Sequence, residues 1–217
     1  MLLPHLERVH LDVSAVLAKQ YQAFAHVWFP EQAVISLVNY MADGSGVEVG
    51  TIGNEGMAGL AAYFEGAESE SDTFCQVAGD ALRIKVAMLT SLADESREMR
   101  RLLNRYAHAY LSQVAQSVAC VRLHDIRQRC ARWLLMTQDR IDGGSTFALK
   151  HEFLALMLGV RRAGVTVAAG ALQDAGLIRY RRGVVCIVDR EGLIAAACEC
   201  YGIVARQYDR LLSPGAN

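Results

Sequence analysis

Residues 151–170 have the sequence HEFLALMLGVRRAGVTVAAG, in which Gly159 separates two apolar stretches. Two helices that cross at a tight turn need a small residue at the crossing, a turn residue that tolerates a left-handed backbone, and apolar residues facing a shared core. Ala155 is the small residue and Gly159 the turn residue. The predicted core positions are Leu154, Leu158, Val160, Val165 and Ala168. The spacing therefore predicts a helix-turn-helix, with an ordinary pair of antiparallel helices as the alternative.

Basic side chains around this stretch favour the helix-turn-helix. Arg161 and Arg162 fall at the start of the second helix, where a recognition helix meets base edges. Residues 177–181 and 184–188 then predict a β-hairpin, or wing, whose arginines would lie along a phosphate backbone. These arginines are Arg179, Arg181 and Arg182. A solvent-exposed face usually mixes its charges more evenly, so we expect this region to bind nucleic acid.

Charge is distributed unevenly along the whole chain. The 217 residues include 22 Lys plus Arg and 23 Asp plus Glu, for a formal charge of −1. Residues 20–82 nevertheless contain nine acidic and no basic residues, whereas residues 83–217 contain 20 basic and 12 acidic ones. Only three of the basic residues are Lys, and Arg is the better reader of phosphate and guanine. This asymmetry points to an anionic partner for the second part of the chain.

Composition excludes several classes of protein. A hydrophobic fraction of 53% with only three Pro argues against disorder, and no apolar run approaches the ~18 residues of a membrane helix. Charged and polar residues interrupt the N-terminal stretch, which predicts no signal peptide and a cytoplasmic protein without a membrane partner. The six cysteines, including the pair Cys198 and Cys200, form no C-x-x-C motif. We therefore expect reduced, buried thiols and no metal site.

The remaining pattern predicts two further parts. Residues 16–85 contain short runs rich in β-formers between turn residues, which is typical of a small sandwich or barrel. Residues 94–121 contain no Pro or Gly and predict a long helix that carries a heptad stripe. The stripe consists of Ala107, Leu111, Val114, Val118 and Val121. We expect this face to pack on a second copy of the chain; the alternative is a single buried helix in a bundle. A further helix is expected over residues 124–141, ending at the DGG of residues 142–144.

These features together resemble the Crp/Fnr family of bacterial transcription regulators. FPEQAVISLVNYMADGSGVEVGTIGNEGMAGL is similar to the family's cyclic-nucleotide-binding-like jelly roll, and the sequence from QRCARWLLMTQDRI onward is similar to its winged helix-turn-helix. The resemblance implies an α+β fold: a β jelly-roll sensory domain at 1–92, a long dimerisation helix at 93–122 and a winged helix-turn-helix at 123–217. It also implies a homodimer that binds double-stranded, palindromic DNA, is modulated by an effector, and has RNA polymerase as a partner.

The sensory part departs from the family members that bind cyclic AMP. In those members a Glu near the short helix contacts the ribose and an Arg before the next strand holds the phosphate. Glu55 matches the ribose Glu, but the sequence EGAESESDTF, where the Arg would fall, is acidic. We therefore expect an effector other than cyclic AMP and no cofactor. The resemblance implies an effector pocket at Gly53, Glu55, Gly56 and Met57.

The reading helix departs as well. Members that recognise the operator of the cyclic AMP receptor carry an Arg-Glu pair followed, four residues later, by a second Arg. Here Arg162 is kept, but Ala163 replaces the Glu and Val167 the second Arg, so the operator must differ. Lys150 also occupies the usual capping Thr position, which removes the helix cap. The expected DNA contacts are Lys150, His151, Arg161, Arg162, Thr166, Arg179, Arg181 and Arg182.

Three alternative functions remain beside a ligand-controlled regulator. An enzyme is disfavoured, because the six His are dispersed and no catalytic motif is present. A regulator that senses redox state through an N-terminal iron–sulfur cluster is excluded, because no Cys precedes residue 75, whereas a haem-sensing regulator would use Cys75 or His26. A regulator without ligand would bind DNA constitutively and be controlled by its abundance.

Overall fold

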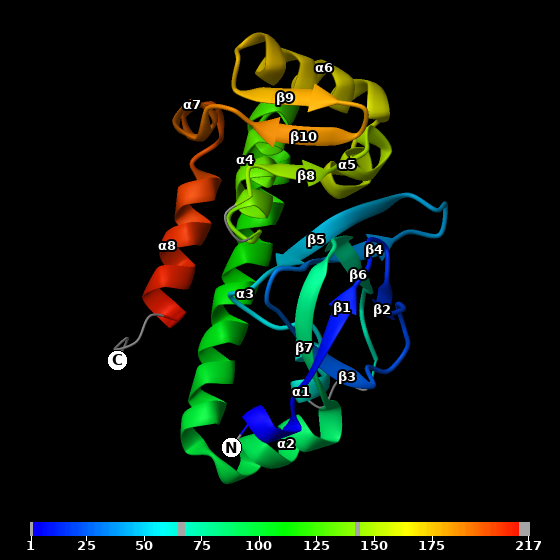
Figure 1. Ribbon diagram of the computed structural model, residues 1–217, viewed down its shortest axis with the longest axis vertical. Coiled ribbons are helices and arrows are strands. Elements are labelled where there is room, and N and C mark those ends of the chain that lie inside the picture. Colours follow the sequence, from blue (N-terminus) through cyan, green and yellow to red (C-terminus); the bar gives the residue numbers. More distant parts are fainter. Residues whose placement is uncertain (1, 65–67, 142–143, 213–217) are drawn as a thin grey trace.

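The protein consists of a β-roll, a long helix and a C-terminal α+β domain, followed by a helix that returns along the long one (Figure 1). Its structure is a computed structural model that describes residues 2–64, 68–141 and 144–212. A short 3₁₀ turn, η1 (Leu3–His5), precedes the roll.

The β-roll is formed by two antiparallel sheets. One has the strand order β1-β7-β3 and the other β2-β6-β4-β5. Its strands are β1 (Glu7–Leu11), β2 (Val16–Ala18), β3 (His26–Pro30), β4 (Val34–Tyr40), β5 (Gly46–Ile52), β6 (Asp72–Val77) and β7 (Gly79–Lys85), with the short helix α1 (Leu60–Tyr63) between β5 and β6. Alternate strand residues such as Ile35, Cys75 and Ala81 are buried between the sheets. Strand β1 precedes residues 16–85, the range over which the sequence pattern predicts β structure.

The long helix begins later than its residue pattern predicts. Helix α2 (Val86–Glu95) ends before Ser96, and α3 (Arg97–Leu123) starts there. The Ser96 hydroxyl accepts a hydrogen bond from the Met99 amide and so caps the new helix. A helix boundary at residue 93 would therefore fall within α2. The sequence predicted one continuous helix because this stretch contains no Gly or Pro. A capping Ser can separate two helices without either residue, so the break was missed.

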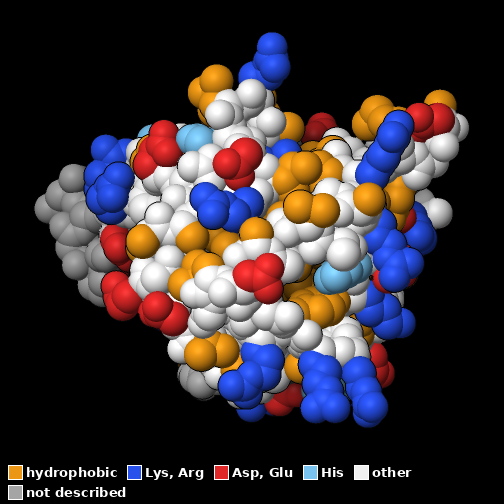
Figure 2. Space-filling model, turned by 90° about the horizontal axis from the view of Figure 1, so that it is seen from above, with side chains coloured by type: hydrophobic (Ala, Val, Ile, Leu, Met, Phe, Trp, Pro, Cys, Tyr) orange, Lys and Arg blue, Asp and Glu red, His pale blue; other side chains and the backbone are white. Residues whose placement is uncertain are grey.

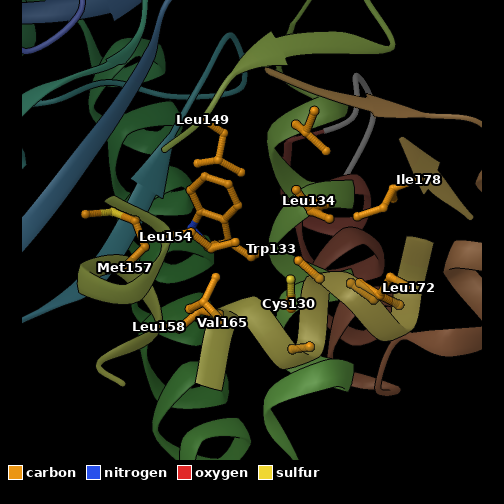
Figure 3. Close-up of a cluster of buried hydrophobic side chains, with 14 of the residues drawn as sticks. Cys130, Trp133, Leu134, Leu149, Leu154, Met157, Leu158, Val165, Leu172 and Ile178 are labelled. Atoms are coloured by element: carbon orange, nitrogen blue, oxygen red, sulfur yellow. The ribbon is translucent and has the colours of Figure 1, made fainter. Parts of the chain in front are cut away.

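The C-terminal domain combines four described helices with a small sheet. Its elements are α4 (Ile126–Gln138), β8 (Thr146–Ala148), α5 (His151–Leu158), α6 (Arg162–Asp174), β9 (Ile178–Arg181), β10 (Val184–Ile187) and α7 (Arg190–Ala196). Asp125 and Gln128 form a capping box that starts α4 directly after α3. The predicted DGG stop falls partly on residues 142–143, which lie outside the described residues. Side chains from α4, α5 and α6 meet around Trp133 and Leu154 in the core (Figure 3).

The chain ends in a helix that was not expected as a separate element. Helix α8 (Cys200–Leu212) runs back along α3, opposite the roll (Figure 1). Its buried Val204 and Tyr208 pack with Leu103 and Tyr106 of α3. Helix α3 is therefore covered by the roll on one side and by α8 on another. Among the described helices, no single one is long and apolar enough to cross a membrane; α5 and α6 meet that test only when joined across their bend.

Candidate DNA-binding surface and effector cavity

Helices α5 and α6 cross at a turn centred on Gly159. The pair is bent by 104°, within the ~90–120° of a helix-turn-helix. Gly159 ends α5 with φ 60° and ψ 42°, in the left-handed region that favours glycine. Of the predicted core positions, Leu154, Ala155, Leu158, Val165 and Ala168 are buried and Val160 is partly buried. The apolar residues thus face one core while the polar face of α6 stays open.

The wing is a hairpin of β9 and β10 closed by two residues with positive φ. Arg182 has φ 52° and Gly183 φ 76°, the pattern of a type I′ turn that matches the twist of the paired strands. Strand β10 also pairs with β8, and the Leu149 amide donates to the Gly183 carbonyl at 2.8 Å. The wing tip is therefore held beside the start of α5.

His151 connects the wing to both helices of the motif. Its ring stacks on Tyr180 of β9, with 4.5 Å between ring centroids. Its Nδ1 lies 3.2 Å from the Thr166 hydroxyl on α6. The Tyr180 hydroxyl in turn donates to the Leu149 carbonyl. His151 is half-buried in these contacts, so its place in the structure is that of a residue positioning the surface rather than one projecting from it.

Basic side chains project from the surface that these contacts assemble. Lys150, Arg161, Arg162, Arg179, Arg181 and Arg182 are all exposed. Figure 2 views the molecule from the end that carries α6 and the wing, where Lys and Arg gather along the right and lower edges. Glu152 forms an ion pair with Arg162 at 2.9 Å. Both side chains of this pair are more than half exposed, so the pair is weak and Arg162 remains available to another partner.

The exposed face of α6 also carries apolar side chains. Val167 is 73% exposed and Ala163 is exposed. These are the two positions at which the sequence departs from the Glu and second Arg of the cyclic AMP receptor. Apolar side chains in the major groove contact the methyl group of thymine.

The roll encloses a cavity of about 830 Å³ against α3. Its walls are largely apolar and include Phe24, Ile52, Met57 and Leu60. Polar groups come from Asn39, Ser69, Ser71, His108 and the acidic Glu68 and Glu70. No Lys or Arg is among the described residues that line it. Glu65, which belongs to the acidic stretch, lies outside the described residues.

The effector pocket implied by the family resemblance overlaps the cavity only in part. Of Gly53, Glu55, Gly56 and Met57, only Met57 lines it. The Glu55 carboxylate instead forms an ion pair with Arg140 at 2.7 Å, just after α4 in the C-terminal domain. Tyr106 fills the space beside Gly56, and Arg140 that beside Gly53. The side chain matched to the ribose Glu is therefore used to join the two domains.

The predicted heptad stripe of α3 is divided between the cavity and the surface. Ala107, Leu111 and Val114 line the cavity. Leu111, Val118 and Val121 are 66%, 69% and 52% exposed. On another face of α3, Leu103 and Tyr106 are buried against the rest of the chain. An exposed apolar face thus runs along α3, from the mouth of the cavity toward the C-terminal domain.

Three of the six cysteines gather with a histidine at the end of α3. Cys120, His124, Cys198 and Cys200 have ligand atoms that all lie within 4.8 Å of one another. The sequence predicted separate buried thiols. The expectation of burial holds for all three cysteines, but they are not separate. The C-x-C pair was the one local signal, and the fold brings the other two residues to it from the end of α3.

Comparisons with known proteins agree with this geometry. Residues 128–196 match the sequence model of the Crp-like helix-turn-helix domain. No curated protein matches the chain.

Similar solved structures include FixK2 from Bradyrhizobium japonicum (14% identity, 89% of this chain and 98% of that one, TM-score 0.76). TTHB099, a CRP family transcriptional regulator from Thermus thermophilus, is also similar (17% identity, 87% and 96%, TM-score 0.72). A third is CLP of Xanthomonas campestris, described as a c-di-GMP responsive global regulator (16% identity, 85% and 95%, TM-score 0.67).

The coverage of nearly the full length of these structures shows that the roll, the long helix and the C-terminal domain occur together in the same fold. The chain therefore has the α+β fold of the Crp/Fnr transcription regulators, with a Crp-like helix-turn-helix domain at residues 128–196.

Proposed function

We propose that this protein is a homodimeric, cytoplasmic transcription regulator that binds two-fold symmetric DNA through α6 and the wing, controlled by an effector other than cyclic AMP. The observation that carries the proposal is the single surface on which α6, the start of α5 and the wing present six exposed basic side chains. This surface, formed by Lys150, Arg161, Arg162, Arg179, Arg181 and Arg182, is called the reading surface. Regulation would act through contact with RNA polymerase or by excluding it from the promoter.

Two arginines on this surface have separable roles. Arg162 lies at the start of α6 and would take a guanine through O6 and N7, whereas Arg181 in the wing would contact phosphate. Arg162→Ala should then weaken binding by about 1–3 kcal/mol and relax specificity at one base pair. Arg181→Ala should weaken binding to all sequences alike and reduce the salt slope by about one.

The test begins with in-vitro selection of DNA by the purified protein. Half-sites separated by about one helical turn are expected. Titration of matched and single-base-changed sites with the two variants then separates base reading from phosphate contact. Arg206→Ala on α8 is the control, because Arg206 is exposed but lies on a different element. Identical behaviour of all three variants, or the absence of any selected sequence, contradicts the proposal.

Val167 and Ala163 favour a half-site with thymine beside the guanine. Replacing that thymine with uracil removes only the methyl group. The replacement should weaken binding of the wild-type protein but not of Val167→Ser, and an equal loss for both proteins contradicts this contact.

The exposed stripe of α3 provides the proposed dimer interface. Burial of Leu111, Val118 and Val121 by a second copy would remove three large apolar side chains from water. The same contact would cover the mouth of the cavity, because Ala107, Leu111 and Val114 line it. Occupancy of the cavity and the relative position of the two reading surfaces would therefore be coupled.

Leu111→Glu tests the dimer by placing a charge within the stripe. We expect a monomer by light scattering and loss of binding to two-half-site DNA. Leu123→Glu is the matched control, because Leu123 is 76% exposed but lies outside the heptad positions. A dimer that survives Leu111→Glu would contradict the use of this face.

The lining of the cavity defines the class of effector. Apolar walls with Glu68 and Glu70 at one side suit a neutral or cationic, largely apolar molecule and oppose a phosphate. Calorimetry should detect no micromolar binding of cyclic AMP, and organic extraction followed by mass spectrometry should reveal any molecule retained from the cell. Micromolar binding of cyclic AMP at physiological salt contradicts this part of the proposal.

The structure also bears on two alternatives, a haem-sensing regulator and a constitutive one. Cys75 is fully buried between the sheets, and burial raises its pKa to about 12, which disfavours a thiolate ligand for haem. A constitutive regulator would bind DNA equally before and after extraction of any retained molecule.

A further inference from the structure

The cluster of Cys120, His124, Cys198 and Cys200 lies apart from both the reading surface and the effector cavity. Cys120 is in the last turn of α3, and His124 is the residue that ends that helix. Cys198 and Cys200 flank the start of α8. The three cysteines are 0%, 3% and 0% exposed and form a small buried cluster of their own. The site therefore lies where the long helix bends into the reading domain and where the last helix begins.

We propose that these four residues bind one zinc ion, which clamps the end of α3 to the start of α8. Zinc in structural sites is tetrahedral, with Zn–S of ~2.3 Å and Zn–N of ~2.0–2.1 Å, and Cys₃His is one of its common ligand sets. The edges of such a tetrahedron are about 3.8 Å between two sulfurs and about 3.6 Å between sulfur and nitrogen.

Two of the separations are close to those edges. The Sγ atoms of Cys120 and Cys198 are 3.5 Å apart, and the Cys200 Sγ lies 3.6 Å from His124 Nδ1. A disulfide requires sulfurs at ~2.05 Å, so Cys120 and Cys198 would have to approach by about 1.4 Å to form one. A disulfide would also leave Cys200 and His124 unused. A zinc ion uses all four residues, whose ligand atoms already lie within 4.8 Å of one another.

The surrounding groups orient the ligands as they would around a bound metal. His124 Nε2 lies 3.1 Å from the Glu199 carboxylate, which leaves Nδ1 facing the sulfurs. A carboxylate on the second ring nitrogen is the usual partner of a metal-binding histidine, because it fixes both ring orientation and tautomer. Gln116 Nε2 also donates to the Cys200 Sγ at 3.0 Å. An N–H donor to sulfur stabilises a ligating thiolate.

The local charge balances that of an occupied site. Three thiolates and Zn²⁺ carry a net charge of −1. The guanidinium of Arg132, on α4, is buried and lies close enough to Cys120 to interact with it electrostatically. Buried charge of one sign requires such a partner.

Four protein ligands leave no open position, so the ion serves structure rather than catalysis. It would join segments about 78 residues apart at the point where α3 gives way to α4. The ion would thereby hold the start of α8 against the bend between α3 and α4. The proposal does not depend on DNA binding, because none of the four ligands belongs to the reading surface.

The experiment measures metal in untagged, full-length protein purified without chelator. Elemental analysis should find about one zinc ion per chain. Cys120→Ser, Cys198→Ser, Cys200→Ser and His124→Ala should each lose it. Cys186→Ser is the matched control, because Cys186 is a partly buried thiol in the wing and outside the cluster. Retention of full zinc by Cys200→Ser overturns the proposal, as does the absence of zinc from wild-type protein after zinc is added.

A second variant separates loss of metal from loss of folding. Glu199→Gln keeps all four ligands, and the Glu199 side chain is 70% exposed, so the fold should be unaffected. Its zinc affinity, measured by competition with a chromophoric chelator, should fall 10–100-fold. Cobalt added to metal-free protein should show visible bands of a tetrahedral ion and thiolate charge transfer in the near ultraviolet. An unchanged affinity in Glu199→Gln, a Cys120–Cys198 disulfide in the peptide map, or iron in place of zinc overturns the proposal.

Discussion

The reading surface and the junction between the domains use polar residues in opposite ways. On the reading surface Arg162 is 66% exposed and forms an ion pair with the exposed Glu152. At the junction the Arg140 side chain is 7% exposed and binds Glu55 of the roll and Gln113 of α3. Trp133 of α4 likewise donates to Glu48 of β5 at 2.8 Å. The first set is available to a partner, whereas the second already has its partners within the chain.

This difference separates the consequences of substitution. An exposed, weakly paired side chain contributes little to folding, so its removal changes binding to DNA. A buried, paired side chain leaves an unpaired group behind when it is removed, so its removal changes stability and the position of one domain on the other. Substitutions in the two regions should therefore be distinguishable by whether stability or DNA affinity changes first.

The largest expected effect is at Arg140. Arg140→Met leaves the Glu55 carboxylate mostly buried and unpaired, which should lower the free energy of unfolding by about 3–5 kcal/mol. Denaturant titration measures this loss. Arg140→Met combined with Glu55→Gln removes the unpaired charge and should recover part of the stability. If the double variant loses the full sum of the two single losses, the two residues do not act as a pair.

The second effect is at Gly159, where the two regions meet. A Cβ there would have to adopt φ 60° and would lie 2.9 Å from Val47 Cγ2 of β5. Gly159→Ala should lower stability by about 1–2 kcal/mol from the left-handed backbone alone. Because Val47 belongs to the roll, DNA affinity should also change, as titration will show. Gly170→Ala on α6 is the control, because a Cβ there meets nothing within 4 Å; equal losses in both variants would contradict the steric argument.

The two regions also differ in how far the sequence predicted them. The motif around Gly159 depends on neighbours within 20 residues, so helical spacing alone places Ala155, Leu158 and Val165 correctly. The ion pair of Glu55 and Arg140 joins residues 85 positions apart, and no local pattern marks it. The family resemblance placed Glu55 in the effector pocket, because it transfers a residue's position but not its partner in this chain.

The cysteine cluster and α8 illustrate the same limit. Cys120 and Cys198 are 78 positions apart, and only the return of α8 along α3 brings them together. Residues 200–212 have helical periodicity, but periodicity does not say which helix they pack against. The wing turn is the opposite case, because Arg182-Gly183 between two β-rich runs is a local signal that predicts the hairpin.

A third, smaller effect is a dependence of stability on pH that originates at Glu48. Burial raises the pKa of this carboxyl above its ordinary 4.5, against the hydrogen bonds from Ser36 and Trp133. The folded protein therefore binds this proton more tightly than the unfolded chain does. The stabilisation is fully present below pH 4.5 and is lost as pH rises through the folded pKa, by up to about 1.4 kcal/mol per pH unit.

Glu48→Gln should remove this dependence, because an amide does not titrate and its oxygen still accepts from Trp133. Denaturant unfolding of both proteins between pH 4 and 8 measures the difference, and the variant should become the relatively more stable protein as pH rises. Glu98→Gln, on the first turn of α3, provides the comparison for an unrelated carboxyl. Parallel curves for wild type and Glu48→Gln would contradict the raised pKa.

The smallest effect should be at Glu152, and it changes only DNA binding. Glu152 holds Arg162 by an exposed ion pair and adds a negative charge next to the expected phosphates. Glu152→Gln removes both the competitor and the repulsion, so DNA affinity should rise by less than about 1 kcal/mol, with stability nearly unchanged. Because the effect is electrostatic, it should shrink as salt is raised. Asp174→Asn at the far end of α6 is the control, since Asp174 is exposed and forms no ion pair among the described residues. A loss of DNA affinity in Glu152→Gln would mean that the Glu152 pair orients Arg162 for its base, and the reading surface would then resemble the junction in depending on a partner within the chain.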